Sequence, residues 1–261
     1  MESVAVVNGR APGYTHRVSV SRVARPGISE DERLPLVDLI REAIRQRLLV
    51  PGAPLIQSAI ADALDVSKIP VREALHALAA EGLVTFTDDG ARVTLLSPSE
   101  IYEVWTLRSV IEPGMAKAIV RELQPNDLAR IATLVEAMGK AADGDEWSDL
   151  NYAFHQDLYG ISALPHFTRL ASHVLTLIEP YSRVAVNRLS GQPAAQAEHR
   201  EMLVALEDSD AERLEQVLVR HSTRARDLLV DYVVTAVERP SRHVATSEAA
   251  RAFVARLEAE T

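Results

Sequence analysis

The sequence contains no cysteine, few aromatic residues and no long apolar run. The absence of cysteine excludes disulfide bonds and thiolate-ligated metal sites. No apolar stretch approaches the roughly 20 residues that a membrane-spanning helix needs, and no secretory signal is visible. We therefore expect a cytoplasmic protein with no membrane partner. An aromatic content of 5% beside many Ala, Leu, Glu and Arg residues favours a mostly helical fold.

An overall positive charge is also lacking, because the formal net charge is -9 at pH 7. This charge argues against a generally basic nucleic-acid binder. The acidic residues are unevenly distributed along the chain. Residues 1–96 contain nearly equal numbers of acidic and basic residues, and most of the excess negative charge lies after residue 96. DNA binding must therefore depend on local basic patches, and it should be sensitive to salt.

Residues 56–80 have the pattern of two short helices joined by a turn. We predict a helix over Ser58–Leu64, a turn at Asp65–Ser67 and a second helix starting at Lys68. Ser67 should cap the second helix, because its hydroxyl can accept from free amides of the first turn. Pro70 suits that turn because it lacks only an amide that has no helical partner. The helix-turn-helix arrangement places its second helix in the major groove of double-stranded DNA.

The second helix separates an apolar stripe from a basic one. Three basic residues, Lys68, Arg72 and His76, follow one another at intervals of four. They should therefore share an exposed face that donates to phosphates and guanine edges. The buried stripe should consist of Val71, Ala74, Leu75 and Leu78. The DNA contacts predicted on and beside this helix are Ser67, Lys68, Ile69, Pro70, Arg72 and His76.

Two short strands are expected after this helix, over Leu83–Thr87 and Arg92–Leu96. Asp88–Gly90 should form the turn, because Asp and Gly tolerate the positive φ of a tight hairpin. We predict a wing whose Gly90 and Arg92 approach the DNA backbone. The alternative is an ordinary small α/β unit with a solvated basic face.

The residue strings of this region are, in order, PGAPL, VSKIPVREAL and EGLV, followed by the Gly-bearing hairpin. They resemble the winged helix-turn-helix of the GntR family of bacterial transcription regulators, over about residues 34–96. The usual family string has Arg where this chain has Lys68, and Ile69 also departs from it. Lysine keeps the charge but not the planar two-pronged donor.

We divide the chain into four parts: a flexible extension (1–31), the DNA-binding unit (32–96), a helical domain (97–238), and a linker with a C-terminal helix (239–261). A helix over Leu36–Leu49, ended by Pro51-Gly52, should back the DNA-binding unit. Its Arg41, Arg45 and Arg47 should lie on or near the outer face, and Arg47 is a further predicted DNA contact.

The helical domain should begin at a joint where Ser97 and Glu100 form a capping box. Short links then separate successive helices, which predicts an antiparallel bundle. The C-terminal helix is expected over Thr246–Glu260. The bundle helices are expected at Pro98–Glu122, Pro125–Asp143, Glu146–Ser162, Pro165–Val186, Ala194–Glu207 and Asp210–Val237.

Three histidines lie on otherwise apolar stripes of three of these helices: His155, His199 and His221. Asn151 stands one turn before His155 and faces the same way. Three imidazoles and an oxygen donor suit a divalent metal ion, with zinc as the first expectation and nickel, manganese or iron as alternatives. The alternative is that each histidine is a hydrogen-bonded core residue.

Arg108 interrupts another apolar stripe, and Glu112 follows one turn later. A buried arginine needs a partner. Arg108 therefore either pairs with Glu112 within the helix or holds the carboxylate of a small acid through two bonds.

The strings LRxxxE, NYAFH, EHREML and RHSTRA, after a winged head, resemble the FadR-type branch of GntR regulators, which carries an FCD ligand domain. The resemblance covers roughly residues 97–232. It implies that Asn151, His155, His199 and His221 bind a metal ion, and that Arg108 helps to bind a small carboxylate effector.

The resulting prediction is a mostly α protein: a winged helix-turn-helix followed by an all-helical antiparallel bundle. We expect a homodimeric regulator, in the first place a repressor, that binds a palindromic operator and responds to a small organic acid. Two alternatives stay open: a metal-dependent enzyme fused to a DNA-binding head, and a sensor of the metal itself.

Overall fold

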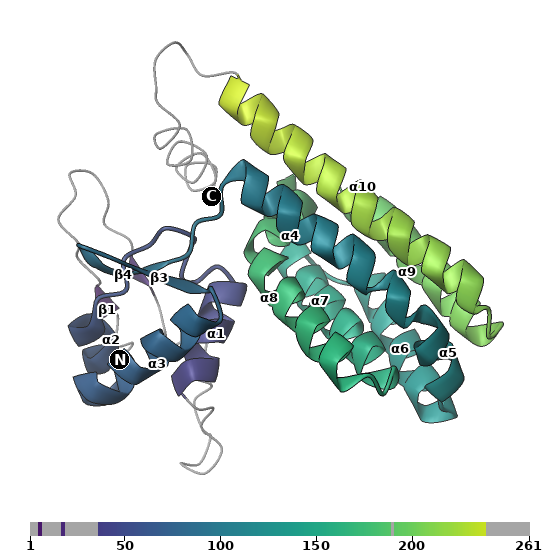
Figure 1. Cartoon of the computed structure of the whole chain (residues 1–261), viewed down its shortest axis with the longest axis horizontal. Coiled ribbons are helices and arrows are strands. Elements are labelled where there is room, and N and C mark those ends of the chain that lie inside the picture. The colour runs from purple at the N-terminus through teal and green to yellow at the C-terminus, as the bar shows by residue number, and fades with distance from the viewer. Residues whose placement is uncertain (1–4, 7–16, 19–35, 189–190, 239–261) are drawn as a thin grey trace. The chain divides into compact units, whose positions relative to one another are not determined.

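The computed structural model describes residues 5–6, 17–18, 36–188 and 191–238. Contacts divide the chain into two compact units, Met1–Leu95 and Leu96–Thr261 (Figure 1). The first unit combines three helices with a hairpin, and the second is helical throughout its described part. The predicted fold class is confirmed.

The N-terminal unit contains the predicted helix-turn-helix and wing. Its helices are α1 (Leu36–Arg45), α2 (Gln57–Leu64) and α3 (Lys68–Ala80). The wing is an antiparallel pair of β3 (Val84–Thr87) and β4 (Gly90–Val93), in which Val84 is opposite Val93. A second antiparallel pair joins β1 (Ala5–Val6) and β2 (Arg17–Val18).

The buried stripe of α3 holds this unit together. Its members are all 3% exposed or less, as the three- and four-residue spacing predicts. The helix α3 contacts α1 and β3, which bury Ile44 and Val84. The stripe consists of Val71, Ala74, Leu75 and Leu78.

Three local predictions in this unit are wrong. The helix α1 ends at Arg45 rather than Leu49, because the chain turns at Arg47, whose φ is 59°. Arg45 is buried and pairs with Glu42, so it is not on an outer face. The hairpin turn is only Asp88-Asp89, and Gly90 already belongs to β4, which ends at Val93.

The expected hydroxyl cap of α3 is also wrong. Ser67 is the N-cap residue with an extended backbone, but its side chain makes no capping hydrogen bond. A serine at this place accepts from the amide of the second or third helical residue. The third residue here is Pro70, which has no amide, so one of the two usual donors does not exist.

The helical unit begins at the predicted capping box, where the Glu100 amide donates to Ser97 Oγ over 3.3 Å and the Ser97 amide donates to Glu100 Oε2 over 2.7 Å. The expected first helix is interrupted, because Pro113 and Gly114 replace its middle with a short 3-10 turn. The elements are α4 (Pro98–Ile111), η3 (Pro113–Met115), α5 (Ala116–Glu122), α6 (Pro125–Met138), α7 (Gly144–Ile161), α8 (Pro165–Arg188), α9 (Gln192–Glu207) and α10 (Ala211–Glu238).

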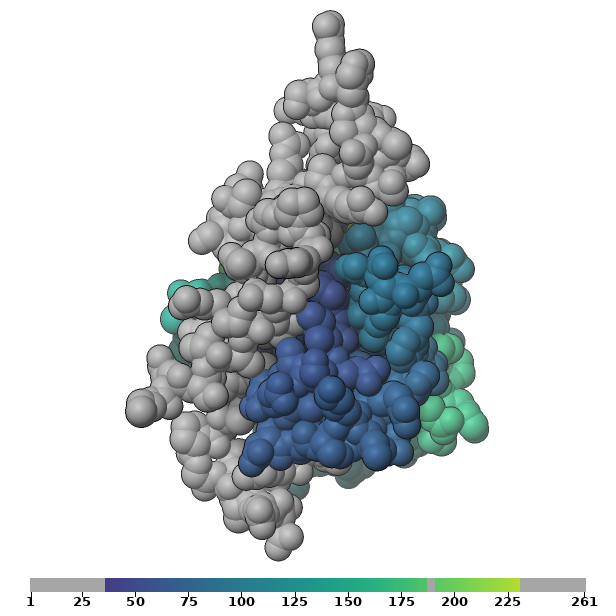
Figure 2. All heavy atoms as spheres, turned by 90° about the vertical axis from the view of Figure 1, so that its left-hand side faces the viewer, coloured from purple at the N-terminus to yellow at the C-terminus, as the bar shows by residue number. Residues whose placement is uncertain are grey.

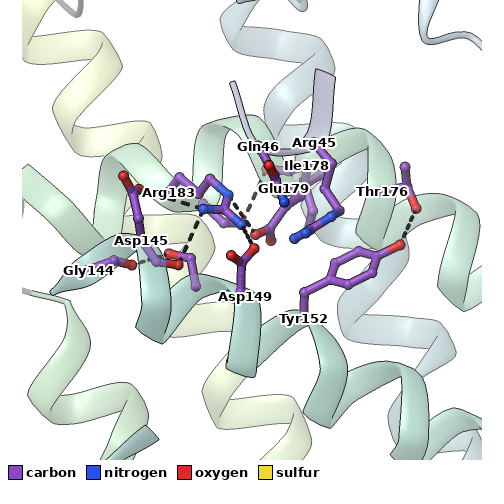
Figure 3. Close-up of polar contacts among 12 residues, drawn as sticks. Arg45, Gln46, Gly144, Asp145, Asp149, Tyr152, Thr176, Ile178, Glu179 and Arg183 are labelled. Carbon is purple, nitrogen blue, oxygen red and sulfur yellow. Dashed lines mark hydrogen bonds and ion pairs between the residues drawn. The ribbon is translucent and has the colours of Figure 1, made fainter. Parts of the chain in front are cut away.

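Polar contacts join α7 to α8 beside the apolar core (Figure 3). Arg183 of α8 is buried, and its guanidinium lies between Asp145 and Asp149 of α7, with Glu179 one turn away on its own helix. Tyr152 shares a 3.0 Å hydrogen bond with Thr176. These contacts fix the register of α7, the helix that carries Asn151 and His155.

Two sequence predictions lie outside the described residues: most of the extension over 1–31 and the helix over Thr246–Glu260. Among the helices that the structure describes, none combines the length and the apolar character that crossing a bilayer requires.

Candidate functional site

The first candidate site is the exposed face of α3. Lys68 and Arg72 are exposed on it, one turn apart, and neither makes an ion pair within the described part of the chain. Ile69 follows Lys68 and has 60% of its surface exposed. The face therefore offers two unpaired cations and one apolar group to a binding partner.

His76 at the far end of this face has a packing partner. Its ring stacks on Phe86 of β3, with centroids 4.5 Å apart and planes 23° from parallel. The contact joins α3 to the wing. His76 therefore has a structural role beside the DNA contact that the sequence predicts.

The wing tip and the turn after α1 carry the remaining predicted DNA contacts. Gly90 is exposed with φ at 112°, a conformation that other residues rarely adopt. Arg92 is partly tied to the protein, because its guanidinium donates to the Gly52 carbonyl over 3.3 Å. Arg47 lies in the turn after α1. In the space-filling view, described residues of this unit, coloured purple to blue, lie at the molecular surface (Figure 2).

The second candidate site is a cluster of three histidines inside the helical unit. His155 of α7, His199 of α9 and His221 of α10 each offer a ring nitrogen, and these nitrogens lie within 4.8 Å of one another. All three side chains are buried, with 0%, 0% and 3% exposure. The structure thus brings together the three imidazoles that the sequence singles out from separate helices.

Burial favours the neutral form of the three rings. Loss of solvation lowers the pKa of His155, His199 and His221, and the nearby Arg108 charge adds to the effect on each. Neutral imidazole has a free nitrogen lone pair, which is the form that binds metal ions.

Unpartnered polar atoms mark the same place. Among the described residues, neither ring nitrogen of His199 has a hydrogen-bond partner, and neither does the Asn151 side-chain oxygen, although all are buried. Such atoms are costly to bury and are rare in folded proteins. A divalent cation would satisfy one nitrogen of His199 and the Asn151 oxygen, so the residues present fit the metal ion that the sequence predicts.

Acidification should destabilise the chelator-treated protein through these histidines. Their pKa in the folded chain lies below the unfolded value of about 6.5, so the unfolded chain binds more protons below that pH. Stability is therefore fully present above about pH 6.5 and is lost as the pH falls below it, by up to about 1.4 kcal/mol per pH unit for each histidine. Urea unfolding over this range measures the slope, and a flat free energy of unfolding would contradict it.

Arg108 borders the histidine cluster from α4. The ion pair within the helix is present, because Arg108 Nε lies 2.6 Å from Glu112 Oε1. The guanidinium also reaches His155, with 2.8 Å between Nη2 and Nε2. Glu112 in turn accepts from Tyr159 and, over 3.2 Å, from Ser222. The carboxylate-binding role of Arg108 stays a prediction, and its position beside the cluster is the one that role needs.

Sequence reasoning missed several partners of the cluster. Glu198 accepts from His221 and from Arg224, and Tyr159 and Ser222 complete the contacts of Glu112. One signal was available: Glu198 follows the buried Ala195 by three residues and precedes the buried Met202 by four, which places it on the inward face of α9.

Comparison with protein families gives two matches. The FCD domain family matches residues 100–224, and the family described as bacterial regulatory proteins, gntR family, matches residues 34–92. The first range covers the histidine cluster and Arg108, and the second covers the helix-turn-helix and most of the wing.

Individual proteins give the same result. An uncharacterized HTH-type transcriptional regulator in an unstable DNA locus of Streptomyces ambofaciens is 30% identical over 173 residues, 66% of this chain and 73% of that protein. A probable D-xylose utilization operon transcriptional repressor of Paenarthrobacter nicotinovorans is 30% identical over 192 residues, 70% of this chain and 82% of that protein. The structure of E. coli McbR/YncC is similar in fold, with a TM-score of 0.68 at 22% identity, and covers 77% of this chain and 99% of that one.

Proposed function

Because the chain belongs to the GntR family of bacterial regulatory proteins and carries an FCD domain, we propose that it is a transcriptional repressor controlled by a small organic acid bound at a metal site. Its family and its relatives are transcription regulators, so the chain is a DNA-binding transcription regulator and not an enzyme. The repressor role, the acid and the metal ion are parts of the proposal, as is a cytoplasmic location.

We propose that α3 reads a palindromic operator from two copies of the chain. Lys68 and Arg72 would donate to phosphates and guanine edges, and Ile69 would contact a thymine methyl group. Ser67, Pro70, His76 and Arg47 would flank this contact, with Gly90 and Arg92 of the wing at the backbone. Two-fold symmetry would place one head on each half-site.

The single observation that supports the effector site is the buried cluster of His155, His199 and His221 with the unpartnered oxygen of Asn151. These residues would hold a divalent ion, with zinc first and nickel, manganese or iron as alternatives. When bound, the ion supplies positive charge that attracts a carboxylate. Arg108 lies at the same place and would grip that carboxylate through its guanidinium.

Control of the operator requires that the acid bind one arrangement of the dimer better than another.

A second candidate, a sensor of the metal ion itself, is favoured by one observation. The guanidinium of Arg108 already has two protein partners, Glu112 and His155, so binding of an acid must compete with them.

A fluorescence-anisotropy titration separates these functions. The operator is first selected from a random duplex pool with zinc-loaded full-length protein, and a panel of small carboxylates is then added with and without chelator. The proposal expects one acid to weaken binding only to the zinc-loaded protein. A metal sensor expects chelation alone to change the affinity. If neither treatment changes it, ligand control of this kind is wrong.

A further inference from the structure

Glu198 of α9 is a buried carboxylate whose contacts lie at the edge of the histidine cluster. Its side chain is 7% exposed, and Oε2 lies 2.8 Å from His221 Nδ1. Arg224 holds both of its oxygens, with 2.8 Å from Nε to Oε1 and 2.8 Å from Nη2 to Oε2. Such a two-bond contact fixes the plane of the carboxylate as well as its position.

The charge of Glu198 determines which atom of His221 carries the proton. Both of its oxygens accept from the Arg224 guanidinium, over 2.8 Å each, which is the pairing of an ionised carboxylate. An ionised carboxylate only accepts hydrogen bonds. The 2.8 Å contact with this acceptor therefore requires a proton on Nδ1 of His221. The lone pair of Nε2 is then left for another partner.

The other two histidines have no such contact. Neither ring nitrogen of His199 has a hydrogen-bond partner, and His155 faces the Arg108 guanidinium, with its Nδ1 3.9 Å from the nearest Glu112 oxygen. Within the parts of the chain that the structure describes, His221 is thus the member of the cluster with a direct carboxylate hydrogen bond. Among the described residues, Glu198 is therefore the acidic residue that forms a direct hydrogen bond with a histidine of the cluster.

We propose that Glu198, clamped by Arg224, is a positioning residue that holds His221 in the tautomer able to bind the metal ion through Nε2. The proposal rests on the metal site of the proposed function. A carboxylate on the second nitrogen of a metal-binding histidine fixes the ring orientation and raises its basicity. Arg224 is one turn beyond His221 on α10, so a single clamp joins α9 and α10 at the cluster.

The full-length Glu198→Gln variant tests the idea, because the amide has nearly the same shape and lacks the charge. We expect its zinc affinity to fall by about 10- to 100-fold in competition with a chromophoric chelator. Glu198→Asp, which keeps the charge, should recover part of this loss. Arg224→Gln should lose part of the affinity, because the carboxylate is no longer clamped.

The chain offers a matched control on the same two helices. Glu201 of α9 pairs with Arg220 of α10, but this pair is about half exposed and forms no hydrogen bond with a histidine in the described part of the chain. Glu201→Gln should therefore bind zinc as the unchanged protein does. An equal loss in both variants would mean that only the α9–α10 contact matters, and it would overturn the positioning role.

Long-range proton–nitrogen NMR of ¹⁵N-histidine-labelled, chelator-treated protein gives a readout that needs no metal. The expected result is a proton on Nδ1 of His221 in the unchanged chain and a mixture of tautomers in Glu198→Gln. A proton on Nε2 in the unchanged chain would overturn the inference even if zinc binds. Failure of the unchanged chain to bind zinc, with Nδ1 protonated, would instead refute the metal site and with it the purpose assigned to Glu198.

Discussion

Replacing Arg72 with alanine is expected to abolish sequence-specific operator binding while leaving the protein folded. The side chain is exposed on α3 and has no ion pair within the described residues, so its loss should change the free energy of unfolding by no more than about 0.5 kcal/mol. Each bidentate arginine–guanine contact is worth about 1–3 kcal/mol. A dimer on two half-sites would lose it twice, which corresponds to roughly 30-fold to 20,000-fold in affinity.

Binding of this variant should be measured by anisotropy on the selected operator and on an unrelated duplex, at two salt concentrations. Binding to the unrelated duplex should change far less, because it depends on total charge rather than on one base contact. Arg121→Ala is the matched control: it removes one exposed guanidinium from α5, whose partner is the neighbouring Glu122. Operator affinity of Arg72→Ala equal to that of this control would refute the reading role of α3.

The sequence predicts those features of the fold that follow from periodic spacing. The stripe of α3 is buried as expected, because residues three and four apart on a helix share one face. Arg108 is buried as expected, because it interrupts an apolar stripe of α4. The same argument places His155, His199 and His221 inward on their helices, and short links between helices bring them together.

Local contacts are less predictable, because they depend on atoms rather than on spacing. The capping hydroxyl of Ser67 has one donor fewer because the third helical residue is a proline. The helix α1 ends early because Arg47 has a positive φ, and the residue types in that stretch do not predict this backbone conformation. The interruption of the first bundle helix was foreseeable, since Pro113 lies inside the expected range.

The partners of the histidines could not be predicted from the sequence, because they depend on how the helices pack. Glu198 and Arg224 lie on different helices, and their contact depends on how α9 packs against α10. Spacing indicates that Glu198 faces inward, but it does not say which side chain it meets. The sequence therefore predicts the metal-binding side chains of the candidate site better than the residues that orient them.

Replacing His199 with alanine is expected to remove the metal ion from the protein. Both nitrogens of this buried ring lack a hydrogen-bond partner, so hydrogen bonding to the rest of the fold does not explain its presence. Its loss should weaken zinc binding by more than the 10- to 100-fold typical of a residue that only orients a ligand. Elemental analysis after dialysis should then find far less than one zinc per chain.

Thermal unfolding gives an independent measure of the same change. Zinc at about 100 times its dissociation constant should stabilise the unchanged protein by about 2.7 kcal/mol, or roughly 5–10 °C for a chain of this size. The His199→Ala variant should show almost no shift, because it has lost a ligand. His173→Ala is the control: this half-buried histidine of α8 lies outside the cluster, and its variant should respond to zinc as the unchanged chain does. A His199→Ala protein that keeps one zinc per chain and its thermal shift would show that the three histidines do not share an ion, because the site would not depend on the ring with two unpartnered nitrogens.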